Sequence, residues 1–139
     1  MRTDLDTEAG MVTAFTVVMT VALIAVTGLV VDGGLALADR QRALDAADAA
    51  ARAGAQALDE RSLRAGQVTV DAGAADRRAT DLLRREGLTG VTSVNGDQVT
   101  VRVTVTRNLT ILGAFGLRPM TINAEGAATA VRGVRTGGD

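Results

Sequence analysis

Carboxylates are the residues of this chain whose spacing comes nearest to a catalytic pattern. Asp45 and Asp48 stand three residues apart, so they would share one face of a helix. Such a pair could act as a general acid and base, but carboxylates at this spacing usually form a solvated helix face. No histidine, cysteine, tyrosine or lysine is present to supply a general base, a thiolate or a common metal ligand. The sequence therefore predicts no enzyme, no catalytic residue, no metal site and no cofactor.

The remaining composition argues against nucleic acid as a partner. The 139 residues include 15 basic and 16 acidic side chains, which gives a formal net charge of −1. Nucleic-acid-binding proteins usually carry a polybasic surface, which this balance does not provide. Phe15 and Phe115 are the only aromatic residues, so surfaces on which bases or sugars could stack are scarce. We expect no nucleic-acid partner.

Residues 11–31 form the only long stretch of the chain without a charge, with the sequence MVTAFTVVMTVALIAVTGLVV. At a helical rise of about 1.5 Å per residue, this run reaches roughly 31 Å, which matches a hydrocarbon core of about 30 Å. Its threonines are compatible with lipid because a helical hydroxyl can bond back to its own backbone. We predict a retained transmembrane helix in contact with membrane lipid.

Two other interpretations of this apolar run stay open. A cleaved signal peptide is one, and Ala36-Leu37-Ala38 offers a small-x-small cleavage site. However, the run is longer than a signal peptide needs, and the leader, residues 1–10, is acidic rather than basic. A buried core helix is the other interpretation, although a small soluble domain would not need so many consecutive uncharged positions.

A helix-forming segment, residues 32–61, follows the apolar run and is rich in Ala, Leu, Arg and Gln. We predict that it continues the apolar helix as an amphipathic spine, so that one long helix lies half in lipid and half in water. Gly33 and Gly34 interrupt the junction between the two halves. We expect a hinge or bend there because each glycine weakens a helix by about 1 kcal/mol.

A stripe of small and apolar residues recurs along this spine at heptad spacing. Its members are Leu37, Leu44, Ala51 and Leu58, with Ala47 and Gly54 at the neighbouring positions. Leucine alternating with alanine and glycine lets another backbone approach closely, as small residues do in membrane helices. The stripe can pack on the protein's own sheet or against other subunits in a bundle or fibre, and both can hold on different faces. Subunit packing through this stripe would make the protein an oligomer.

The distal part of the chain, residues 62–132, is predicted to be a small α+β head. Its cleanest pattern is QVTVRVTVT, residues 98–106, whose valines alternate with polar residues as in an antiparallel strand with one buried face. Asn95-Gly96-Asp97, just before that strand, is a strong hairpin signal. The other expected elements are a short strand at 67–72, an amphipathic helix at 74–87, a strand at 91–94 and a last strand at 120–131.

An apolar loop, residues 109–118, joins the last two expected strands and has the sequence LTILGAFGLR. It either caps the core of the sheet or touches the membrane surface or a partner. The tail, residues 133–139, is expected to be flexible.

These elements combine into a membrane-anchored α+β fold. A long N-terminal helix, with a transmembrane half and an amphipathic half, is expected to pack on a small antiparallel sheet with one extra helix. A sheet of three or four strands is near the lower limit of independent stability. It gains most in stability if the long helix covers its valine face.

Residues 10–58 resemble the TadE/TadG-like proteins of the Tad (Flp) pilus system, which are pilin-like. The resemblance rests on Gly10, Thr13 and Phe15 at the entry, on residues 31–34 at the exit, and on the alanine-rich segment 46–55. A weaker similarity continues through residues 101–107, the apolar loop and residues 124–131. The resemblance implies a membrane-anchored pilus-assembly protein or minor pilin, with its head outside the bacterial cytoplasmic membrane.

The favoured hypothesis is a structural component of a Tad-type (type IV-related) pilus or secretion system that packs laterally through the stripe. Its partners would be other pilin-like or pilus-assembly proteins. The alternative is a monomeric membrane-anchored extracytoplasmic module that binds or regulates another envelope protein. A third hypothesis, an envelope hydrolase, would need an acidic pair whose geometry the sequence does not suggest. Arg2 before the anchor and Arg40 and Arg42 after it mildly oppose an external head on charge alone.

Overall fold

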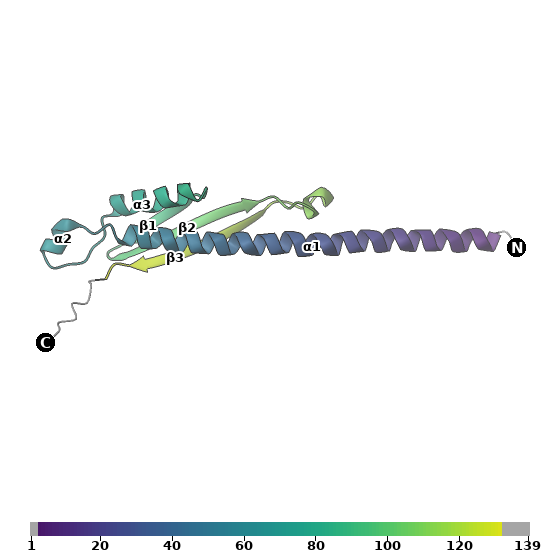
Figure 1. The fold of residues 1–139 in the computed structure, drawn as a ribbon, viewed down its shortest axis with the longest axis horizontal. Coiled ribbons are helices and arrows are strands. Elements are labelled where there is room, and N and C mark those ends of the chain that lie inside the picture. Colours follow the sequence, from purple (N-terminus) through teal and green to yellow (C-terminus); the bar gives the residue numbers. More distant parts are fainter. Residues whose placement is uncertain (1–2, 132–139) are drawn as a thin grey trace, which may run out of the picture. The chain divides into compact units, whose positions relative to one another are not determined.

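The computed structural model describes the backbone of residues 3–131 and the side chains of residues 10–131. Along the chain the elements are α1 (Thr3–Ala55), α2 (Glu60–Arg64), α3 (Ala72–Arg85), β1 (Gly90–Asn95), β2 (Gln98–Arg107), the 3-10 helix η1 (Leu112–Phe115) and β3 (Met120–Thr129) (Figure 1). The predicted α+β class is confirmed, because a long apolar N-terminal helix packs on a three-stranded antiparallel sheet with an extra helix.

The described chain divides into two compact units. The first contains α1 up to Leu37 together with the segment Arg107–Met120. The second contains the remainder of α1, the helices α2 and α3, and the body of the sheet. The boundaries predicted at residues 10, 31, 61 and 132 stay predictions, and the tail at 133–139 lies outside the described residues.

β1 and β2 form an antiparallel hairpin in the second unit. Asn95 pairs with Gln98 next to the turn, and Gly90 pairs with Val103 at the far end. Gly96 has a φ of +63°, a conformation that glycine adopts without the steric cost that a side chain would bring. The hairpin predicted from Asn95-Gly96-Asp97 is therefore confirmed.

β2 buries one face and exposes the other, as its alternation predicts. Its buried positions are Val99, Val101 and Val103. On the opposite face, Arg102 Nη2 lies 2.5 Å from Glu125 Oε2 of β3. Two residues further along, the Thr104 hydroxyl lies 3.0 Å from the Asn123 side-chain oxygen. These pairs join β2 to β3 in antiparallel directions, which gives the strand order β1-β2-β3.

The part of α1 after Leu37 packs on the valine face of the sheet through alanines. Its fully buried positions are Ala43, Ala47, Ala50 and Ala51. β3 comes so close to α1 at Gly126 that a Cβ there would overlap the backbone of Ala47 and Asp48. Glycine on the strand and alanine on the helix therefore let the two backbones approach each other directly.

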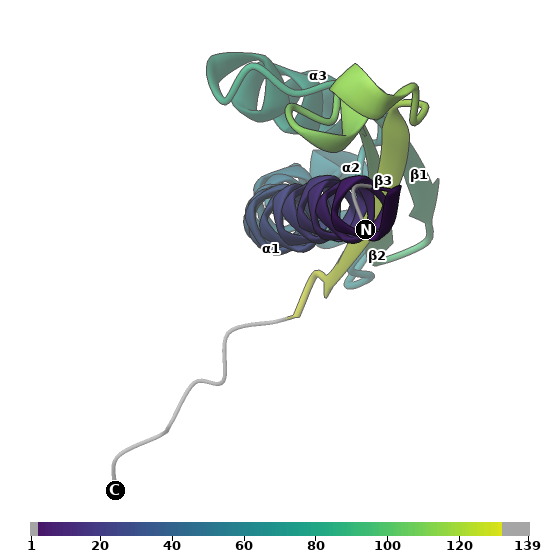
Figure 2. The same cartoon turned by 90° about the vertical axis from the view of Figure 1, so that its right-hand side faces the viewer.

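α3 packs on the same face of the sheet, beside α1 (Figure 2). Its buried residues are Ala75, Ala79 and Leu83. A Cβ at Gly54 of α1 would lie 3.0 Å from Val99 Cγ1 and 3.4 Å from the Ala75 carbonyl oxygen, so α1, α3 and β2 meet there. The helix predicted at 74–87 is confirmed, although both of its ends lie slightly earlier in the chain.

Two elements differ from the expectation. α1 ends at Ala55 rather than near residue 61, and the strand expected at 67–72 is reduced to one bridge between Leu58 and Val70. The Asp59 amide donates to the Thr69 carbonyl at 2.9 Å, and the Asp71 amide donates to the Ala57 carbonyl at 2.8 Å. These long-range bonds hold the chain after Ala55 out of a helix, so they override the helix propensity of its residues.

Aspartates begin the two helices that follow α1. The Asp59 carboxylate accepts a hydrogen bond from the Ser62 amide, and the Asp71 carboxylate accepts one from the Ala74 amide, both at 2.8 Å. Each bond satisfies an amide that would otherwise lack a partner in the first helical turn. The bond from Ser62 also lowers the pKa of the Asp59 carboxyl from its ordinary value.

Candidate functional site

The two aspartates singled out in the sequence, Asp45 and Asp48, are exposed on α1. No group of three or more acidic side chains within the part of the chain that the structure describes is placed to hold a metal ion. Asp45 accepts a hydrogen bond from the Gln41 side chain at 3.0 Å on an exposed face of α1. The pair Asp45 and Asp48 thus lies on a solvated helix face, and the remaining candidates are surfaces for membrane and protein contact.

The apolar run of α1 presents its side chains outward. Among the described residues, one helix is long and apolar enough to cross a membrane, and only 6% of its most apolar window is buried. A core helix of a soluble domain would have most of this window buried. The large exposed side chains extend from Met11 to Val31. This helix is consistent with a single-pass membrane anchor.

The threonines of the apolar run satisfy their hydroxyl groups within the helix. Thr16, Thr20 and Thr27 each donate to a backbone carbonyl four residues earlier, at 2.8 Å. A lipid environment offers no water to pair with these hydroxyls, so internal pairing removes the cost of their polarity. The predicted bonding of threonine hydroxyls back to the helix backbone is confirmed for these three residues.

Asp32, the first charged residue after the apolar run, accepts three hydrogen bonds from backbone amides of the apolar loop. One of its oxygens accepts from the Thr110 amide at 3.0 Å, and the other accepts from the amides of Ile111 and Leu112 at 3.0 and 2.8 Å. The side chain is only 2% exposed. Asp32 therefore fixes the start of η1, where helical amides need an external acceptor.

Gly28 gives the apolar loop room to approach α1. A Cβ at this position would lie 2.7 Å from Ile111 Cγ2 and 3.3 Å from Leu112 Cδ2. Gly28, Asp32 and Ala36 follow one another at intervals of four and are all buried, so they form one face of the helix. The loop packs on this face, and none of its residues belongs to the buried core of the sheet. The interpretation of the loop as a cap of the sheet core is wrong.

In the sequence, Asp32 stands out only as part of residues 31–34, the exit segment of the family resemblance. The signal that could have found this site is an acid directly after an uncharged helix, with Gly28 and Ala36 one turn away on either side. Its partners lie nearly eighty positions later in the chain, so no local pattern links them.

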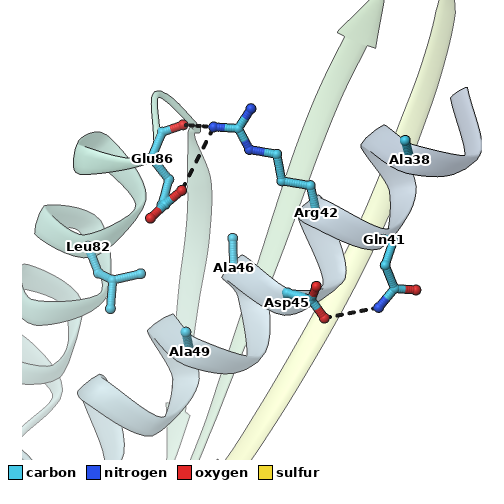
Figure 3. Close-up of a pocket in the computed structure, with 8 residues that line it drawn as sticks. All are labelled: Ala38, Gln41, Arg42, Asp45, Ala46, Ala49, Leu82 and Glu86. Atoms are coloured by element: carbon cyan, nitrogen blue, oxygen red, sulfur yellow. Dashed lines mark hydrogen bonds and ion pairs between the residues drawn. The ribbon is translucent and has the colours of Figure 1, made fainter. Parts of the chain in front are cut away.

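A surface groove lies between α1 and α3 in the second unit (Figure 3). It has a volume of about 520 Å³ and is lined by Ala38, Gln41, Arg42, Asp45, Ala46 and Ala49 of α1 and by Leu82 and Glu86 near the end of α3. At its rim, Arg42 Nη2 lies 3.2 Å from the Glu86 carbonyl oxygen and 3.8 Å from Glu86 Oε2. The groove thus combines an alanine floor with a charged rim, which suits contact with another helix.

The structure separates the six residues of the predicted stripe. Ala47, Ala51 and Gly54 are buried in the protein's own core, and Leu44 is partly buried beside them. Leu37 is 70% exposed, and Leu58 is also exposed. The stripe is therefore covered by the protein's own sheet over its middle part. Contact of the stripe with other subunits stays a prediction. Of its members, Leu37 and Leu58 are exposed and so could make such a contact.

The hinge glycines lie inside the continuous helix α1. A Cβ at Gly33 or Gly34 would meet no atom within 4 Å, so neither glycine is required by a close neighbour. Backbone flexibility is then the physical property that glycine contributes at this point of the helix. The bend between the anchor and the spine stays a prediction.

Replacing both hinge glycines, by Gly33→Ala and Gly34→Ala, is expected to stiffen α1 by about 1 kcal/mol per position. Amide hydrogen exchange around residues 30–38 should slow in the membrane-embedded protein. Gly10→Ala is a matched control because this position is equally open on the same helix. Unchanged exchange at the junction in the double variant would contradict a flexible hinge at these glycines.

One family comparison bears on these surfaces. Residues 10–57 match the Tad family model, described as Flp pilus-assembly TadE/G-like. Residues 10–57 form a Tad domain. The match confirms the resemblance noted in the sequence for these residues, and the family that the model describes is a structural family of pilus assembly. No curated protein and no solved structure gives a significant match.

The Tad domain contains the apolar run, Asp32, the hinge glycines and most of the stripe. It ends just after α1, so the sheet and the apolar loop lie outside it. The part of the chain that carries the family signal is thus also the part that carries the membrane-capable helix.

Proposed function

We propose that the protein is a structural component of a Tad-type pilus or secretion system. In this proposal residues 11–31 anchor it in the bacterial cytoplasmic membrane, and the α+β head lies on the extracytoplasmic side. The observation that carries the proposal is the coincidence of the Tad domain with an outward-facing apolar helix that continues into the head. In this proposal the head is the folded domain outside the membrane, while the helix makes the contacts with lipid and with other subunits.

The small and exposed residues of α1 support the lateral packing that this proposal includes. Helices associate in membranes through small residues that let their backbones approach. Alanines line the groove floor at positions 38, 46 and 49, while Leu37 is exposed. The buried members of the stripe hold α1 to its own sheet, so contact with a second copy would use the exposed residues of α1. Such contacts leave the fold of each subunit intact.

Single cysteines test lateral packing directly, because the natural chain contains none. Leu37→Cys and Ala49→Cys should form crosslinked dimers or ladders in native membranes. Ala51→Cys is the matched control, since this position is on the same helix but fully buried. Absence of crosslinks at both Leu37 and the half-buried Ala49 would exclude packing through these parts of α1.

The partner of each crosslink separates the two functional hypotheses. Products between copies of this chain, or with other pilin-like subunits, support a structural component. If Ala49→Cys crosslinks only to a different envelope protein, the groove serves the alternative, a monomeric binding or regulatory module. Protease treatment of intact spheroplasts tests orientation, because an external head should be cleaved and a protected head would contradict the proposed placement.

A further inference from the structure

We propose that the apolar loop, residues 109–118, is a second membrane contact that inserts into the interfacial layer of the bilayer beside the end of the anchor helix. The occupant of its exposed surface is lipid. This inference goes beyond the proposed function, in which the helix is the sole membrane contact, and it does not depend on assembly into a pilus.

The depth of the loop follows from its contacts with α1. Ile111 and Leu112 lie against Gly28, which precedes Val31, the end of the apolar run, by about 4.5 Å along a helix axis. A run that spans the hydrocarbon core places its last turn near the boundary between acyl chains and headgroups. The loop is therefore held at the level of that boundary by the helix itself.

Six backbone amides of the loop are paired within the protein, which lowers the cost of placing this irregular backbone near the hydrocarbon core. Irregular backbone at membrane depth is tolerated only where its polar groups are paired. The amides of Thr110, Ile111 and Leu112 are paired by Asp32. Three further amides of the loop donate to its own carbonyls: Ala114 to Ile111 at 3.2 Å, Gly116 to Gly113 at 3.0 Å, and Leu117 to Leu112 at 3.3 Å.

Asp32 makes this pairing possible without presenting a charge to lipid. Its carboxylate is buried and its two oxygens are directed at three amides, so the charge is satisfied inside the protein. An acid at the end of an anchor helix would otherwise face the headgroup layer unpaired. The same three hydrogen bonds thus pair the amides of the loop and satisfy the carboxylate of the helix.

The exposed side chains of the loop suit the interfacial layer. Phe115 is 55% exposed, and Leu117 is also exposed. Arg118 follows them directly and is exposed, and no acidic residue occurs between Arg107 and Asn123. Apolar side chains next to an arginine match a surface in which acyl chains lie below phosphate groups. This charge balance and the continuity with the anchor helix favour lipid over a second protein as the occupant.

Single tryptophans test the inference in the full chain, which contains no natural tryptophan. Phe115→Trp, reconstituted in vesicles of phosphatidylcholine and phosphatidylglycerol, should show blue-shifted emission and strong quenching by lipids brominated near the headgroup. Val91→Trp is the matched control, because Val91 is an exposed apolar residue of β1 in the other unit. It should be quenched by aqueous iodide and not by brominated lipid.

Two further variants identify what holds the loop in lipid. Adding Asp32→Ala to Phe115→Trp should reduce quenching by brominated lipid, and Arg118→Glu should reduce it in anionic vesicles more than in neutral ones. The inference is overturned if Phe115→Trp is as accessible to iodide as Val91→Trp. It is also overturned if the fluorophore is shielded from both quenchers at high protein density and becomes accessible to iodide on dilution, since a protein partner would then cover the loop.

Discussion

Gly126→Ala is expected to destabilise the second unit by about 3 kcal/mol or more, toward the upper end of overpacking penalties. The added Cβ would overlap the backbone of Ala47 and Asp48, which cannot move aside as a flexible side chain would. Relief would require β3 to separate from α1 and would open the core around the buried valines. Chemical denaturation followed by circular dichroism, with the anchor in detergent, should show an earlier transition.

Gly73→Ala is the matched control for this loss of stability. It also replaces a glycine of the second unit, but the nearest atom to its Cβ, Asp71 Oδ1, lies at an ordinary contact distance of 3.4 Å. Because Gly73 is inside α3, alanine there should stabilise by up to about 1 kcal/mol. If Gly126→Ala unfolds within about 0.5 kcal/mol of the natural chain, the close approach of β3 to α1 is not maintained in solution.

Asp32→Ala is expected to release the apolar loop from α1. The amides of Thr110, Ile111 and Leu112 would lose their acceptor together, and η1 would lose the group that fixes its first turn. Their hydrogen exchange should accelerate at least about tenfold, the factor that corresponds to loss of one hydrogen bond to a charged group. The effect should be confined to the loop, because the sheet core does not include it.

Two other substitutions test whether the carboxylate of Asp32 holds the loop. Asp32→Asn keeps the size of the side chain but replaces one acceptor oxygen by a donor, so it should release part of the loop because both carboxylate oxygens are used. Asp76→Asn, an exposed position on α3, should leave exchange in the loop unchanged. Equal protection of the loop in Asp32→Ala and in the natural chain would show that apolar contact at Gly28 alone holds it.

The spacing of small residues in the stripe predicted close packing but not the identity of the surface that packs there. Heptad spacing identified Ala47, Ala51 and Gly54 as places of close backbone approach. The structure has such approaches at Ala47 and Gly54, and Ala51 is fully buried between them. Small residues specify that something packs closely, but they do not specify what packs there. The sheet of the same chain takes that place because Gly126 and Val99 present a matching surface to α1.

The end of α1 illustrates a second limit. Residues 56–61 have good helix propensity, and nothing in their local sequence requires the helix to stop at Ala55. The stop comes from hydrogen bonds with Thr69 and Asp71, which belong to a segment that folds back beside them. Single-residue propensities of a few tenths of a kcal/mol are smaller than the combined effect of such bonds.

Neighbouring residues alone were enough to predict the apolar helix, the valine strand and the hairpin at Asn95-Gly96-Asp97. The first is encoded by an uncharged run long enough for a bilayer, the second by an alternation of period two, and the third by a turn that needs glycine. The family of residues 10–57 was likewise recognisable from their sequence. The bonding of Asp32 to the apolar loop and the packing of Ala47, Ala51 and Gly54 on the protein's own sheet became apparent only from the three-dimensional structure. Both depend on residues far apart in the chain, and a buried carboxylate reveals its role only when the amides that it pairs are in place.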